Sequence, residues 1–133
     1  MKYKELIIKN AKLINELNED IKIKCKNRDK SVFEMNLWSQ SCLKFHKIYS
    51  ELAFLGGILG YRDRLRNGEI NTIEYALEFL EMRPYFFRSG YIHSDLLRVL
   101  KNCELTTEQM NIVKSCNKKF QEYKLNKKLI NKK

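Results

Sequence analysis

Apolar side chains recur at helical spacing along most of the chain, and this periodicity constrains the fold more than any other sequence feature. The first stretch predicts a helix over about 4–25, with Leu6, Ile14 and Ile21 on its inner face. No segment shows the sustained two-residue alternation of a half-buried strand. We therefore expect an all-α protein of five or six helices, arranged as a compact bundle or a short stack of α-hairpins.

A long second helix is predicted to follow a polar break near residue 30. Ser31–Glu34 has the form of a capping box, in which a hydroxyl and a carboxylate satisfy each other's unpaired amides. A sustained apolar stripe follows, beginning at Phe33. Gly56 and Gly57 should weaken or kink this helix, and we expect helix to continue through Tyr61–Leu65.

Three further helices are expected in the C-terminal half. Asn71–Glu74 again has the form of a capping box, and Pro84 should end that helix because proline disfavours helical backbone in the residue before it. The linker Tyr85–Tyr91 leads to a short helix, and Thr106–Gln109 should cap the last one. Beyond about residue 124 we expect a Lys-rich extension in which the helix frays.

A chain of 133 residues fits one domain, and we expect all of it to form a single helical domain. No apolar run approaches the roughly 18 residues that span a bilayer, and Lys9 and Lys12 interrupt any signal-peptide pattern. We therefore expect a cytoplasmic protein without a membrane partner. The four cysteines have no paired spacing, which favours reduced thiols over disulfides.

The net charge of +10 is concentrated at the two ends of the chain. Residues 1–30 carry nine basic and five acidic side chains, and residues 101–133 carry nine and three, whereas the middle is neutral. The ends are mostly lysine and the middle mostly arginine, which suits bidentate contacts better. Two interpretations remain open: a lysine bias on solvated helix faces, or attraction to an acidic partner such as an acidic protein or a nucleic acid.

Arginine and tyrosine supply the best candidates for contacts with a partner. The linker combines aromatic side chains with an arginine, the residue types that anchor protein interfaces and also stack on unpaired bases. In the alternative interpretation, Phe86 and Phe87 fill the core while Arg88 caps the C-terminus of a helix. The residues predicted to bind a partner are Arg62, Arg66, Tyr85, Arg88, Tyr91 and Arg98.

The candidates for catalysis and metal binding are few. Arg88 and His93 have the Arg-x4-His spacing and thereby resemble the all-α HEPN ribonucleases, in which the two residues converge on a phosphate. Cys42 and His46 share a helical face and could form half of a metal site, but no second half has a paired spacing. We therefore predict no catalytic site, no metal, no cofactor and no enzymatic activity.

The stretch from about Tyr61 to Val113, and above all the run Phe86–Tyr91, resembles small helical bacterial proteins of unassigned activity. Such proteins are associated with the immunity partners of secreted antibacterial toxins. The resemblance implies a non-catalytic inhibitor that covers the active site of a toxin, such as a nuclease. The alternatives are a basic nucleic-acid-binding or regulatory module and, third, a HEPN-like ribonuclease.

Overall fold

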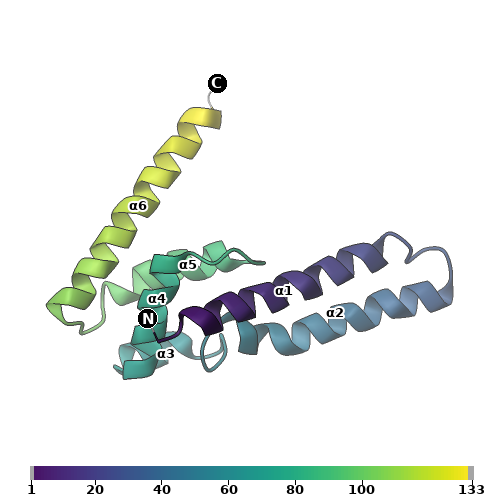
Figure 1. Cartoon of the computed structure of the whole chain (residues 1–133), viewed down its shortest axis with the longest axis horizontal. Coiled ribbons are helices and arrows are strands. Elements are labelled where there is room, and N and C mark those ends of the chain that lie inside the picture. Colours follow the sequence, from purple (N-terminus) through teal and green to yellow (C-terminus); the bar gives the residue numbers. More distant parts are fainter. Residues whose placement is uncertain (1, 132–133) are drawn as a thin grey trace.

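Six α-helices make up the computed structural model, which describes residues 2–131 (Figure 1). No strand forms within these residues, so the prediction of an all-α protein with five or six helices is confirmed. None of the helices described is both long enough and apolar enough to cross a membrane. The helices are α1 (Lys4–Cys25), α2 (Val32–Ala53), α3 (Tyr61–Arg66), α4 (Ile70–Met82), α5 (Ser89–Leu100) and α6 (Thr107–Asn131).

The first two helices form a long hairpin that extends away from the other four (Figure 1). The Ser31 hydroxyl accepts a hydrogen bond from the Glu34 amide at 3.1 Å, which confirms the predicted start of α2. The inner faces were predicted less well. Ile7 is buried and Leu6 is 37% exposed, while Phe33 is 68% exposed because it lies near the free end of the hairpin.

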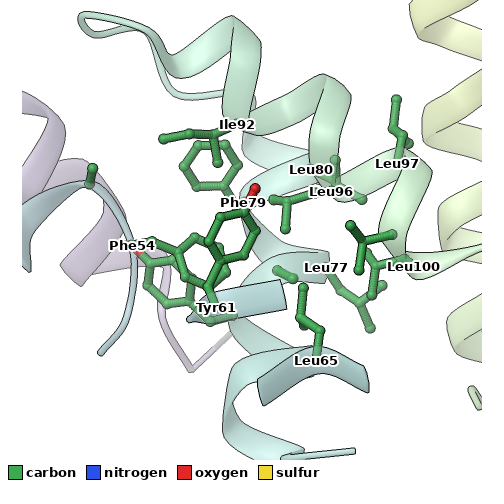
Figure 2. Close-up of a cluster of buried hydrophobic side chains, with 14 of the residues drawn as sticks. Phe54, Tyr61, Leu65, Leu77, Phe79, Leu80, Ile92, Leu96, Leu97 and Leu100 are labelled. Atoms are coloured by element: carbon green, nitrogen blue, oxygen red, sulfur yellow. The ribbon is translucent and has the colours of Figure 1, made fainter. Parts of the chain in front are cut away.

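The hydrophobic core lies where the end of α2 meets α3, α4 and α5 (Figure 2). Phe54 is fully buried there, with its ring 4.8 Å from that of Tyr75 and 5.0 Å from that of Tyr61. Leu96 and Leu100 close the core from α5. Helices α4 and α5 each bury more residues than any other helix, which accounts for their apolar composition.

Helix α2 ends at Ala53, so the predicted kink at Gly56 and Gly57 is wrong. Phe54 has extended backbone and turns the chain into a loop. Arg64 holds this loop by donating to the carbonyls of Leu55 at 2.9 Å and Gly57 at 2.7 Å. Gly56 has a positive φ, and a Cβ there would lie 3.2 Å from the Arg64 guanidinium, so the loop requires glycine at this position.

Of the two capping boxes predicted in the second half of the chain, one is confirmed and one is wrong. Thr106 and Gln109 exchange side-chain hydrogen bonds at 3.0 and 3.1 Å, which confirms the capping box before α6. The box proposed at Asn71–Glu74 is wrong, because α4 already begins at Ile70 and has no side-chain cap. Thr72 is buried within the first turn of α4, and its hydroxyl donates to the Glu69 carboxylate at 3.4 Å.

Helix α6 packs on the body through Val113 and Cys116, with Phe120 partly buried beside them. Beyond Phe120, the positions on the same face are Lys124 and Lys127. Every residue from 121 to 131 is exposed, and α6 projects away from the rest of the protein (Figure 1). The helix nevertheless continues to Asn131, so the expected fraying beyond residue 124 is not observed.

Candidate partner-binding groove

A groove of about 910 Å³ lies between α1 and the distal half of α6. One wall is α1 between Asn15 and Lys22, and the other is α6 between Phe120 and Lys127. Its floor is the segment 83–91 together with the second turn of α5. We call this surface the basic groove. The two helices that form its walls lie on either side of α5 in Figure 1.

The basic groove carries far more positive than negative charge. Five basic side chains line it, against the single carboxylate of Glu19. The other side chains of the groove are largely aromatic or neutral and polar. Like charges gathered in a concave surface reinforce one another and attract anions. The basic residues are Lys22, Arg83, Arg88, Lys124 and Lys127.

Two arginines in the left-handed region bracket the floor of the groove. Arg83 follows the last turn of α4 with φ of 48°, and Arg88 precedes α5 with φ of 65°. Glycine is the residue that adopts this backbone without strain, and another L-residue costs about 1 kcal/mol there. The guanidinium of Arg83 lies 5.1 Å from the Tyr123 ring centroid, and that of Arg88 lies 5.2 Å from the Phe87 ring centroid. The fold therefore accepts strained backbone at two of the five positions that supply the positive charge of the groove.

The aromatic residues of the segment divide between core and surface. Phe86 is buried, and Phe87 is partly covered by Phe45, whose ring centroid is 5.7 Å away. Tyr85 is 88% exposed and Tyr91 is 78% exposed. The alternative interpretation of the linker is thus right for Phe86 and wrong for Phe87, which is 43% exposed. It is also wrong for the arginine, since Arg88 stands at the N-terminus of α5.

The six residues predicted to bind a partner do not form one surface. Tyr85, Arg88 and Tyr91 line the basic groove. The other three lie outside it. Arg62 donates from Nε to Asp95 Oδ2 at 2.7 Å, Arg66 pairs with Asp63 at 3.8 Å, and Arg98 is exposed in the last turn of α5.

Asp95 joins α3 to α5 beneath the surface. It accepts hydrogen bonds from the Tyr61 hydroxyl and from Arg62. Burial would raise the pKa of Asp95, but these two donors outweigh burial and hold that pKa below its usual value. Burial and the carboxylate together raise the pKa of Tyr61 to about 12. Arg62 therefore acts within the fold, and its charge is largely neutralised by Asp95.

His93 lies beneath the groove in the second turn of α5. Its ring lies 5.2 Å from that of Phe120, measured between centroids, and is tilted against it by 52°. Both imidazole nitrogens are buried, and neither has a hydrogen-bond partner of normal geometry among the described residues. Burial and the charge of Arg83 lower the pKa of His93, although the Leu80 carbonyl partly opposes them. In this conformation neither nitrogen reaches the groove for acid–base chemistry alongside Arg88.

The buried His93 should make stability fall at acidic pH. Its folded-state pKa lies below 6.5, so the unfolded chain binds the proton more readily and stability is lost as the pH drops through 6.5. We expect His93→Phe to reduce the difference in unfolding free energy between about pH 7 and about pH 5. Urea unfolding at both pH values measures this difference. The exposed His46→Gln is the control and should keep the wild-type pH dependence, and an unchanged His93→Phe profile would contradict the assignment.

The cysteines do not assemble a metal site among residues 2–131. Cys42 is partly buried and His46 exposed on α2, and no group of three or more His, Cys, Asp or Glu side chains that could hold a metal forms in this range. Burial raises the pKa of the Cys103 and Cys116 thiols. A higher pKa disfavours the thiolate that binds metals, so these two residues serve the core.

Sequence reasoning missed the α1 and α6 walls of the groove. A signal for the α6 wall was present, because Lys124 and Lys127 continue the spacing of Val113, Cys116 and Phe120 on one helical face. Where the residues on the inner face of a helix change from apolar to lysine, the helix stops packing on the hydrophobic core. Position Lys22 carried no comparable signal, because its place in the groove depends on how α1 packs on α4.

The basic groove can hold a partner that presents anionic groups together with apolar ones. Its exposed tyrosines offer apolar area with a polar tip, and its arginines and lysines offer donors to carboxylates or phosphates. No protein-family model, no curated protein and no solved structure matches this chain.

Proposed function

We propose that this protein is a non-catalytic inhibitor of the immunity type, which acts in the cytoplasm by covering the active site of an antibacterial toxin domain. The observation that carries the proposal is the basic groove, with five basic side chains against one carboxylate around two exposed tyrosines. The partner in this proposal is an acidic protein, and a nuclease that handles nucleic acid through an electronegative metal site is one example.

Electrostatics and aromatic anchors would contribute to different steps of binding. A positive concave surface steers an acidic partner and raises the association rate. Tyr85 and Tyr91 would then slow dissociation, because tyrosine and arginine dominate the binding energy of protein interfaces. Tyr85 stands on the loop between α4 and α5, where the Asn15 amide donates to its carbonyl at 2.9 Å, and Tyr91 stands in the first turn of α5. The anchors are thus positioned before binding, which lowers its entropic cost.

A second candidate function is the binding of single-stranded nucleic acid. The observation in its favour is the same pairing of lysines with exposed tyrosines, because bases stack on aromatic rings while phosphates meet cations. This function predicts an affinity that falls steeply with salt and depends little on the shape of any protein surface.

Capture from the source cell separates the two functions. Tagged protein is recovered with and without nuclease treatment, and the captured partner is then purified and its affinity measured. We expect one stoichiometric protein that survives nuclease, and an affinity loss of about tenfold or more for Tyr91→Ala and Arg88→Ala. Arg98→Ala is the matched control outside the groove and should bind as the wild type does. Recovery of nucleic acid alone, lost on nuclease treatment, would overturn the proposal.

A further inference from the structure

We infer that the basic groove receives an acidic amphipathic α-helix of the partner, held between α1 and the distal half of α6. This inference rests on the proposed function, because it assumes a protein partner. It goes further in naming the secondary structure and the charge of the segment that binds, and in giving the projecting end of α6 a role.

The distal half of α6 is not covered by any other part of the described chain. The face that packs on the body at Val113 and Cys116 continues as Lys124 and Lys127. Lys124 Nζ lies 4.5 Å from the centroid of the Phe120 ring, at the point where packing on the body ends. The helix remains regular to Asn131 although each of its residues from 121 onward is exposed. Its inner face therefore presents cations at helical spacing to the groove.

The opposite wall and the floor complete a cradle of suitable chemistry. Lys22 stands on the α1 wall, across the groove from Lys124 and Lys127. Tyr85 and Tyr91, at 88% and 78% exposure, rise from the floor between the two walls. Cations at the sides and aromatic rings in the centre match a helix that has an apolar stripe with carboxylates along its margins.

The backbone chemistry of the groove favours a helical over an extended occupant. The walls are helices, whose backbone groups are already paired, and none of the described residues offers a strand edge. An extended segment would leave its own amides and carbonyls without partners, whereas a helix satisfies them internally. A helix about 10 Å in diameter would fill the groove's volume over about two turns.

Carboxylates fit the cations of the groove in type and spacing. Arg83 and Arg88 can each engage a carboxylate with two parallel hydrogen bonds. Lys124 and Lys127 are three residues apart, which matches carboxylates three or four residues apart on a facing helix. Charge complementarity therefore selects an acidic helix. A nucleic acid would use the same charges but would not require the helical spacing.

A labelled synthetic peptide of about 18 residues tests the inference. It is amphipathic, with leucine on one face and glutamate along both margins, and binding to the full-length protein is measured by fluorescence anisotropy. We expect saturable binding that weakens with salt. The double variant Lys124→Glu/Lys127→Glu should weaken it by about tenfold or more. The matched control Lys114→Glu/Lys118→Glu changes two exposed lysines of α6 that do not line the groove, and it should bind nearly as the wild type does.

Three further arms decide the outcome. A peptide of the same composition in scrambled order, and one with a central proline that breaks the helix, should both bind at least about tenfold more weakly. Equal binding of all three peptides, or equal loss in both double variants, would overturn the inference. Tighter binding of oligo-dT than of the acidic helix, lost in the groove variant, would replace it with the nucleic-acid function. If no peptide binds but the capture experiment yields a stoichiometric protein partner, the inference of a helical segment is refuted. The proposed function would then still stand.

Discussion

Replacing Phe54 with alanine is expected to lower the free energy of unfolding by about 4 kcal/mol. Its side chain is fully buried, and its ring lies between those of Tyr61, Tyr75 and Phe79 (Figure 2). Truncation removes the transfer free energy of the ring and leaves a cavity that three rigid aromatic neighbours cannot close. Urea unfolding followed by circular dichroism measures the loss as a shift of the midpoint at constant slope.

The control for this variant is the other phenylalanine near an end of α2. Phe33 is 68% exposed at the free end of the hairpin, so Phe33→Ala should change the free energy of unfolding by less than about 0.5 kcal/mol. Similar losses in the two variants would show that Phe54 does not stand at the centre of the core.

Replacing Asp95 with alanine should lower the free energy of unfolding by about 3 kcal/mol, the second largest effect. The change leaves the Tyr61 hydroxyl without its acceptor below the surface and leaves Arg62 without its carboxylate. The pKa of Asp95 is held below 3.8, so its contribution is present above that pH and is lost as the pH falls through the folded-state pKa. The wild type and the variant should therefore converge in stability at acidic pH.

Asp63 provides the matched control for Asp95. Its carboxylate lies 3.8 Å from Arg66 on the surface of α3, with the side chain 80% exposed. Such ion pairs contribute little, so Asp63→Ala should leave the stability unchanged within about 0.5 kcal/mol. A large loss here, or none at Asp95, would contradict the assignment of Asp95 as the link between α3 and α5.

The helices could be predicted because their signals are local. Apolar spacing, the hydroxyl of Ser31, the pair Thr106–Gln109 and the restriction imposed by Pro84 all act within a few residues of the chain. The errors occurred where the surroundings override local preference. Asn71 does not cap α4, because the helix already begins at Ile70 and Asn71 lies within its first turn.

The candidate site was predictable only in part. The aromatic and arginine content of the linker drew attention to Tyr85, Arg88 and Tyr91, and all three line the groove. The same reasoning also selected Arg62. Residue type alone does not reveal that Asp95, 33 residues further along the chain, pairs with this arginine. Residue type indicates what a side chain can bind, whereas its partners inside the fold determine whether it remains available.

The amino-acid sequence alone was thus sufficient to predict an all-α chain and most of the helix boundaries. It also showed that lysines are concentrated at the two termini and arginines in the middle of the chain. These properties depend on neighbours within one or two turns. The groove, the division between buried Phe86 and exposed Tyr85, and the tie between Asp95 and Arg62 became visible only in the folded chain. They depend on the packing of α1 and α6 on α4 and of α3 on α5, because helices that are separated in sequence meet only when their apolar faces are buried together.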